Sequence, residues 1–338
     1  MVSMIIPSLD DLRALASSPF TREACSPLGP RPYLLLPKEV LEHLRLAADR
    51  EAVVRWLTTA PCPVIGVGPE QDEPDLFAPC DAVVSSELDL STITANIERS
   101  PQAAMVLVQL LRATADMPVI EALTVESLAY GVLQAGPEYR AWLEIGKPAK
   151  SRPAQDDGPP VLIERHDQQL DVRLNRPSTL NALSVELRDA VCEALQLVLS
   201  DATISAVTLS GEGRCFSIGG DLTEFGEAPD PATAHVVRSI RLPAFFLSQC
   251  APRVEARLHG ACIGAGVELP AFARRVIATK DAFFQLPELR FGLIPGAGGC
   301  VSLPRRIGRR RTAYMVLTGR RITAARALQW GLVDALCD

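Results

Sequence analysis

Two glutamates set in glycine-rich, otherwise apolar segments are the residues of this chain best suited to acid/base chemistry. Glu268 ends the segment 259–268, and Glu288 follows a leucine and a proline at the edge of the segment 292–299. Burial raises the pKa of a carboxyl group toward neutrality, where the group can both accept and donate protons. The pair therefore indicates general acid/base catalysis. Residue type and spacing alone leave two other interpretations open, a solvated helix residue at Glu268 and a loop cap at Glu288.

Two glycine-rich turns are suited to hold a negatively charged oxygen atom. Residues 215–221 contain Gly219-Gly220 and follow a predicted strand, and residues 259–268 follow another strand and lead into a predicted helix. Glycine permits close approach of the backbone, and the N–H groups at a helix N-terminus favour an anion. Two such turns on neighbouring strands would direct two N–H donors at one oxygen, which is the requirement for an oxyanion hole.

These turns need a frame of strands and helices, and the second half of the sequence predicts one. A hairpin is expected over 161–174 and a helix over 184–199, with a serine at its N-cap position. Strands are expected over 204–209 and 252–258, and an apolar, helix-like stretch over 265–273. Repeated strand–turn–helix units are typical of a layered α/β domain.

The first half of the sequence has a different pattern. Strands are expected over 32–36, 63–68 and 82–84, and helices over 38–59, 91–115 and 118–143. Residues 146–160 are rich in proline, glycine and charge, which is typical of a linker. We therefore predict an N-terminal α/β and helical domain over 1–145, the linker, and a second domain over 161–338.

Composition excludes several classes of function. The chain has 338 residues, which at about 150 residues per domain predicts two domains. Its net charge of −6 argues against general nucleic-acid binding. The sequence contains no uninterrupted run of about 18 apolar residues, the length that a membrane-spanning helix needs. Its nine cysteines are scattered singly, and its start lacks the features of a signal peptide. We therefore expect a cytoplasmic protein with reduced thiols, no metal site, and no nucleic-acid or membrane partner.

Five ordered motifs in residues 161–338 resemble those of the crotonase family, also called the enoyl-CoA hydratase/isomerase superfamily. They are Asn-Arg-Pro with Leu-Asn-Ala-Leu within 175–183, Phe-Ser-Ile-Gly-Gly-Asp at 216–221, the run ending in glutamate at 259–268, the Pro-Glu and glycine-rich run at 286–299, and the Thr-Gly to Val-Asp stretch at 318–334. The resemblance covers a little over half of the chain. It implies the crotonase fold, an α/β spiral of ββα units, here preceded by the smaller N-terminal domain.

The resemblance also implies an acyl-CoA ligand and specific site residues. The backbone N–H groups of Ile218 and Ala265 would form the oxyanion hole for the thioester carbonyl. Glu268 and Glu288 would flank the substrate double bond, with Glu268 orienting or deprotonating a water molecule and Glu288 donating the α-proton. The remaining residues of the expected substrate site are Gly219, Gly220, Asp221 and Gly296. Coenzyme A is part of the substrate, so no separate cofactor is expected.

The chain departs from the family's pattern at several places, and three of these departures bear most directly on the expected site. Ala265 stands where the family commonly has glycine, and its Cβ would crowd the acyl group if the backbone there needs a positive φ. Ile218 replaces a small residue and would narrow or reshape the pocket. The printed sequence ends at Asp338 without the C-terminal helical region that family members usually have. The N-terminal half would either cover the site in its place or serve an unrelated role.

Together these features predict the hydration of a 2-enoyl-CoA thioester to a 3-hydroxyacyl-CoA. One alternative is another crotonase-type reaction, namely double-bond isomerisation, thioester hydrolysis or enolate oxygenation. The other alternative is a non-catalytic acyl-CoA-binding protein, against which the retained glutamate pair argues. The resemblance also implies a homo-oligomer, either a trimer or a hexamer.

Overall fold

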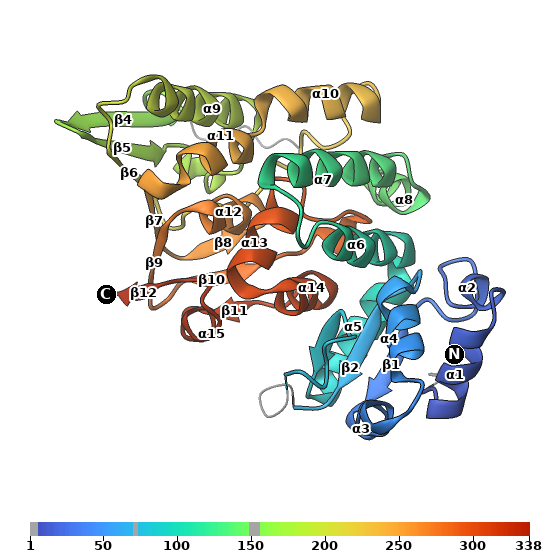
Figure 1. Cartoon of the computed structure of the whole chain (residues 1–338). Coiled ribbons are helices and arrows are strands. Elements are labelled where there is room, and N and C mark those ends of the chain that lie inside the picture. Colours follow the sequence, from blue (N-terminus) through green and yellow to red (C-terminus); the bar gives the residue numbers. More distant parts are fainter. Residues whose placement is uncertain (1–5, 70–73, 149–155) are drawn as a thin grey trace.

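Within residues 6–69, 74–148 and 156–338, which the computed structural model describes, the strands form three β-sheets (Figure 1). The first lies in the N-terminal part and has the order β1-β2-β3. The second has six strands in the order β12-β9-β7-β6-β5-β4, and the third has the order β11-β10-β8. The mixed α/β class predicted from the sequence is confirmed.

The N-terminal sheet is parallel and shares an apolar cluster with short helices. Its strands are β1 (Leu34–Pro37), β2 (Val64–Val67) and β3 (Ala82–Val84), close to the three predicted ranges. The helices beside it are α1 (Leu9–Ser17), α2 (Thr21–Ala24), α3 (Lys38–Leu46) and α4 (Arg50–Thr59). The single helix predicted over 38–59 is wrong, because the chain is extended at Ala47 and separates α3 from α4.

Four helices follow this sheet and pack against the C-terminal half of the chain. They are α5 (Glu87–Arg99), α6 (Pro101–Ala113), α7 (Val119–Gln134) and α8 (Pro137–Ile145). The long helices predicted over 91–115 and 118–143 are each interrupted where Pro101 or Pro137 begins a new helix. Proline suits the first position of a helix and disrupts its interior, which explains both breaks.

Side chains of these four helices belong to the same apolar core as the C-terminal half. Leu107 of α6 and Met315 are buried in one cluster. Asn96 of α5 adds a polar link, since its Nδ2 donates to the carbonyl oxygen of Thr318 at 3.0 Å. The division into two domains stays a prediction, and residues 149–155 of the predicted linker lie outside the described residues.

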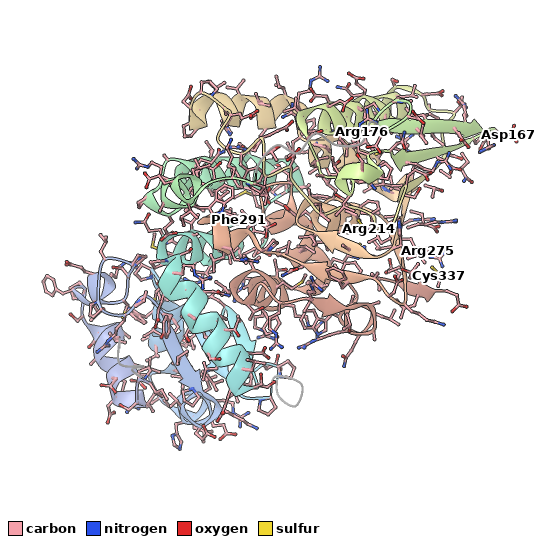
Figure 2. All side chains as sticks on the ribbon, turned by 180° about the vertical axis from the view of Figure 1, so that it is seen from behind. Asp167, Arg176, Arg214, Arg275, Phe291 and Cys337 are labelled. Carbon is pink, nitrogen blue, oxygen red and sulfur yellow. The ribbon has the colours of Figure 1, made fainter. Side chains whose placement is uncertain are left out.

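The six-stranded sheet begins with the predicted hairpin and continues with parallel strands. β4 (Val161–His166) and β5 (Gln169–Leu174) pair antiparallel, and Asp167 at their turn has a positive φ of 52° (Figure 2). The other strands are β6 (Ala206–Gly211), β7 (Val254–Leu258), β9 (Arg275–Thr279) and β12 (Ala335–Cys337). The helices of this part are α9 (Val185–Ser200), α10 (Pro231–Arg241) and α11 (Pro243–Cys250). As predicted, the Ser184 hydroxyl caps α9, where it accepts a hydrogen bond from the Leu187 N–H.

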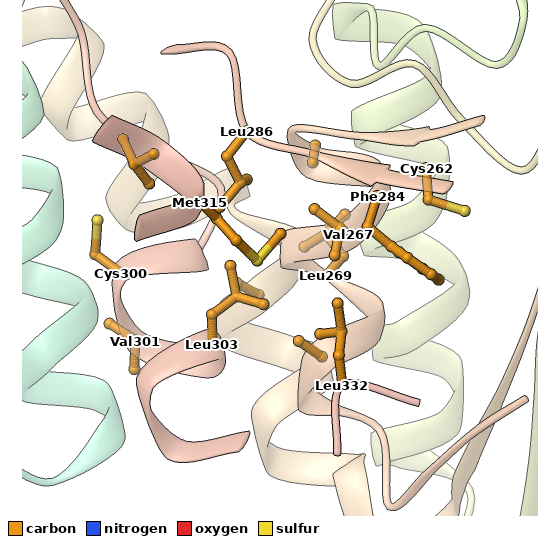
Figure 3. Close-up of a cluster of buried hydrophobic side chains, with 14 of the residues drawn as sticks. Cys262, Val267, Leu269, Phe284, Leu286, Cys300, Val301, Leu303, Met315 and Leu332 are labelled. Carbon is orange, nitrogen blue, oxygen red and sulfur yellow. The ribbon is translucent and has the colours of Figure 1, made fainter. Parts of the chain in front are cut away.

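The third sheet and its helices carry the glycine-rich segments. Its strands are β8 (Ala261–Ile263), β10 (Phe283–Gln285) and β11 (Ile322–Thr323). The helices are α12 (Ala265–Glu268), α13 (Gly299–Ile307), α14 (Arg309–Thr318) and α15 (Ala324–Trp330). The stretch predicted over 265–273 is one helical turn followed by a 3₁₀ turn that begins at Pro270. Val267, Leu303 and other buried side chains form the core that supports α12 and α13 (Figure 3). Figure 1 shows α6 and α7 beside α13.

Three further properties of the described ranges concern membrane spans, metal ligands and thiols. No helix there is long and apolar enough to cross a membrane. Those ranges also hold no group of three or more His, Cys, Asp and Glu side chains suited to a metal ion. The cysteines are free thiols, and all but Cys337 are buried.

Candidate active site

The two glycine-rich turns predicted to hold an oxygen atom lie side by side. Ser217 donates its N–H to the Ala261 carbonyl at 3.3 Å and accepts from the Ile263 N–H at 3.0 Å. Gly266 sits against the same serine, since a Cβ at position 266 would lie 2.4 Å from the Ser217 carbonyl oxygen. A side chain at position 266 would therefore force the turns apart, and glycine is required there.

Ala265 presents a backbone N–H that has no acceptor within the described part of the chain. It is the first residue of α12, and the preceding Gly264 takes the positive φ of 52° at this turn. The crowding expected for an alanine with positive φ is therefore absent, because the left-handed conformation falls on glycine. The free Ala265 N–H is a donor available to a ligand oxygen.

Ile218, the second predicted donor, already has an acceptor. Its N–H donates to the Leu180 carbonyl at 3.2 Å. Leu180 and Asn181 have φ values of 59° and 52°, a conformation that residues other than glycine rarely adopt. The fully buried Asn181 side chain holds this turn by donating to the carbonyls of residues 215 and 216. A ligand oxygen at Ile218 would share the Ile218 N–H with the Leu180 carbonyl. A ligand oxygen at Ala265 would be the sole acceptor of the Ala265 N–H.

Glu268 and Glu288 converge on Gly264. A Cβ built on Gly264 would lie 2.9 Å from Glu288 Oε1 and 3.9 Å from Glu268 Oε1. Glu268 is 2% exposed, and its Oε2 accepts hydrogen bonds from the N–H groups of Ala297 (2.8 Å) and Gly299 (2.9 Å). Oε2 of Glu288 is buried and has no hydrogen-bond partner among the residues that the structure describes. The fold thus brings the two predicted carboxylates together beside the turn that carries the free N–H.

Burial sets the protonation of this pair. It raises the pKa of Glu268 to about 7, against the opposing effect of the two N–H donors. It also raises the pKa of Glu288 well above its ordinary value, and the negative charge of Glu268 adds to the effect. Burial therefore favours the protonated form of Glu288, and Glu268 can gain or lose its proton near neutral pH. Carboxyl groups whose pKa is raised in this way are suited to proton transfer near neutral pH.

A third buried carboxylate, which the sequence analysis missed, comes from the N-terminal half. Glu126 of α7 is 1% exposed, and its oxygens accept from the N–H groups of Gly298 (2.7 Å) and Cys300 (2.8 Å). Burial and the charge of Glu268 raise the pKa of Glu126 well above its ordinary value. The signal that could have revealed it is its place on the buried face of α7, four residues after Ala122.

All eight residues predicted for the site line one cavity of about 730 Å³. They are Ile218, Gly219, Gly220, Asp221, Ala265, Glu268, Glu288 and Gly296. Asp221 fixes its own loop, because its Oδ1 accepts from both the N–H and the hydroxyl of Thr223. The location of these residues is a property of the fold, and their roles in binding and catalysis stay predictions.

Part of the cavity wall belongs to the N-terminal helices. Tyr130 of α7 and Tyr139 of α8 line it. The Tyr130 ring rests on Gly296, where a Cβ would lie 2.3 Å from Tyr130 Cδ2. Trp142 of α8 packs on Phe291, labelled in Figure 2, with ring centroids 5.0 Å apart. Both halves of the chain therefore build the cavity.

Comparisons with known proteins match about half of the chain. The enoyl-CoA hydratase/isomerase family matches residues 165–338. The 2,3-dehydroadipyl-CoA hydratase of Escherichia coli K12 is 37% identical over 177 residues, which are 52% of this chain and 68% of that protein. The mitochondrial enoyl-CoA hydratase of Pongo abelii is 35% identical over 168 residues, 49% of this chain and 57% of that protein. An enoyl-CoA hydratase/isomerase structure from Mycobacterium paratuberculosis has a TM-score of 0.50 and 28% identity, covering 54% of this chain and 75% of that chain.

Proposed function

The chain belongs to the enoyl-CoA hydratase/isomerase family, and on this premise we propose that it adds water to a 2-enoyl-CoA to form the 3-hydroxyacyl-CoA. The observation that carries the proposal is the convergence of Glu268 and Glu288 on Gly264. Two buried carboxylates beside a free N–H donor supply a base, an acid and a support for a developing oxyanion. The acyl-CoA substrate follows from the family.

Backbone donors hold the thioester carbonyl in the proposed mechanism. The carbonyl oxygen accepts from the Ala265 N–H, and the Ile218 N–H serves as the second donor. These bonds strengthen as negative charge develops on the oxygen, so they lower the barrier more than they tighten substrate binding. Polarisation of the carbonyl makes the β-carbon electrophilic.

The two glutamates divide the proton transfers. Glu268 is anchored through Oε2 and keeps Oε1 to orient a water molecule and take its proton. The water oxygen bonds to the β-carbon, the double bond shifts to form the enolate, and Glu288 gives its proton to the α-carbon. A proton then passes from Glu268 to Glu288 and restores the starting state. The sum of these steps is the addition of one water molecule across the double bond.

Loss of the enoyl-thioester absorbance band tests the proposal directly. The full chain should turn over a 2-enoyl-CoA such as crotonyl-CoA, and Glu268→Gln and Glu288→Gln should each lower kcat by about 10²–10⁴-fold. Glu186→Gln is the matched control, because Glu186 is exposed and pairs with Arg176. Tight acyl-CoA binding with no loss of the band on short, long or aryl-substituted enoyl-CoAs would reject hydration.

Proton exchange separates the remaining alternatives. A hydratase or isomerase should exchange the α-proton of a bound acyl-CoA with heavy water, whereas a non-catalytic acyl-CoA-binding protein should not. Appearance of the enoyl band from a 3-enoyl-CoA would identify isomerisation instead of hydration. We also propose a cytoplasmic location and a homo-oligomer, either a trimer or a hexamer. Sedimentation of the purified chain would test the oligomeric state.

A further inference from the structure

Arg238 of α10 brings a guanidinium group to the cavity wall and forms no ion pair with a carboxylate of the described residues. It lines the cavity together with Tyr130 and Gln134 of α7, the helix beside α10 in Figure 1. Its Nε donates to Ser127 Oγ at 2.9 Å, Nη1 to Gln134 Oε1 at 3.0 Å, and Nη2 to the Ser127 carbonyl at 3.2 Å. All three acceptors are neutral groups.

Two of the five N–H bonds of this guanidinium have no acceptor in the described part of the chain, one on each terminal nitrogen. Burial lowers the pKa of Arg238, since its charge lies partly out of water. Glu126 acts on Arg238 through its charge, but the Glu126 oxygens are bonded to the N–H groups of Gly298 and Cys300. A partly desolvated cation without a paired anion is unfavourable, so this end of the cavity favours an anionic ligand.

The Tyr130 ring contacts both Arg238 and the loop whose N–H groups bind Glu268. The Arg238 Cζ lies 4.8 Å from the centroid of the Tyr130 ring. The same ring contacts Gly296, and the next residue, Ala297, donates its N–H to Glu268. An acyl chain whose double bond lies at the glutamates can therefore extend along Tyr130 toward the guanidinium.

We propose that Arg238 binds the distal end of the acyl chain, and that the preferred substrate is a 2-enoyl-CoA whose chain ends in a carboxylate. This inference rests on the proposed function for the reaction and adds the class of substrate. A carboxylate can accept one N–H from each terminal nitrogen of a guanidinium, a match that lysine would not reproduce. Between the two ends, Ile218 and Ile294 line the cavity beside the hydrocarbon part of such a chain.

Binding of two saturated ligands of equal chain length tests the inference without turnover. Adipyl-CoA and hexanoyl-CoA differ only in the distal carboxylate, and calorimetry on the full chain should show adipyl-CoA binding about 10- to 100-fold more tightly. Arg238→Gln should reduce this ratio to about 1, and Arg238→Lys should keep only part of it. Arg241→Gln, on the same helix and outside the cavity lining, is the matched control and should retain the wild-type ratio.

Turnover distinguishes failure of this inference from failure of the proposed function. If none of the 2-enoyl-CoAs is hydrated, 2-hexenoyl-CoA and its distal carboxy analogue included, the proposed reaction fails, while the binding ratio still decides the role of Arg238. If wild-type protein binds both saturated ligands equally, the inference is overturned, whatever the reaction. Equal binding of adipyl-CoA and 6-hydroxyhexanoyl-CoA would also overturn it, because a neutral acceptor would then suffice. The wild-type comparison needs no variant, so a folding defect in Arg238→Gln would not obscure the result.

Discussion

Glu126 and Glu268 bind alternate N–H groups of one helix N-terminus. Glu268 accepts from residues 297 and 299, and Glu126 accepts from residues 298 and 300. N–H groups at the start of a helix have no intrahelical partner, and the positive end of the helix dipole stabilises nearby carboxylates. Glu126 and Gly298 are 172 positions apart in the chain. A residue of the N-terminal half therefore helps to hold the loop that orients the proposed catalytic base.

Replacing Glu126 should weaken both the fold and the reaction. Glu126→Gln keeps one acceptor oxygen but directs an NH₂ group at the other N–H, so we expect a loss of about 1–3 kcal/mol in the free energy of unfolding. The displaced loop should also lower kcat by about tenfold. Urea unfolding and steady-state kinetics measure the two effects. Glu121→Gln, in the first turn of the same helix and exposed, is the control, and an equal loss there would contradict the prediction.

The pH profile of kcat/KM should be bell-shaped. Glu268 must be ionised to take a proton, and its pKa of about 7 predicts that kcat/KM falls as the pH drops below this value. Glu288 must be protonated, and its raised pKa predicts a second fall at higher pH. Because the two groups interact, the limbs report the pair and not each residue alone. A rate with a 2-enoyl-CoA that stays constant down to pH 5 would contradict these assignments.

Glu288 should make the fold less stable as the pH rises. A carboxyl group whose pKa is higher in the folded than in the unfolded state contributes stability at low pH and loses it as the pH rises through the folded value. Glu288→Gln removes this titration, so it should be more stable than wild type at pH 8 and close to wild type at pH 4. Urea unfolding at the two pH values measures the difference. If the free energy of unfolding differed between Glu288→Gln and wild type by the same amount at pH 4 and at pH 8, burial would not raise the pKa of Glu288.

Gly266 should tolerate no side chain. In Gly266→Ala the added Cβ would meet the Ser217 carbonyl oxygen at 2.4 Å, and a backbone oxygen cannot move without separating the two turns. We expect a lower melting temperature and loss of hydration of at least about 10²-fold, since both proposed oxyanion donors shift. Gly131→Ala is the contrasting variant, because its Cβ would meet nothing closer than 3.6 Å and a helical alanine stabilises. A stable, active Gly266→Ala would refute the tight packing.

The buried Asp81 ion pairs should be more costly to break than an exposed ion pair. Asp81 is 1% exposed and accepts from Arg112, from Arg309 Nη1 at 2.7 Å, and from the Val64 N–H at 2.9 Å. Asp81→Asn leaves two partly buried guanidinium groups without their anion, which should cost about 3–5 kcal/mol of the free energy of unfolding. Asp49→Asn breaks a more exposed pair with Arg13 and should cost at most about 1 kcal/mol. Similar costs for the two variants in urea unfolding would contradict the prediction.

Short-range signals determined the local structure of the C-terminal half. Two apolar segments around the polar residues 167–169 predicted the hairpin over 161–174, and Ser184 predicted the start of α9. Five motifs predicted the family, which the match over 165–338 confirms. Glu268 and Glu288 were visible as candidates because they are the only glutamates in two glycine-rich, largely apolar segments. Such signals act over a few residues, so one sequence is enough to read them.

Only the tertiary structure decided which groups face the cavity and which are already bonded. The Ile218 N–H is bonded to the Leu180 carbonyl, while the Ala265 N–H has no acceptor among the residues that the structure describes. Glu126 is 172 positions from Gly298, and Arg238 is 111 positions from Ser127. These contacts depend on which helix faces meet, and that is set by the packing of the whole core. A pattern along the chain shows that a helix has an apolar face, but the neighbour that covers the face is chosen by the burial of many distant side chains at once.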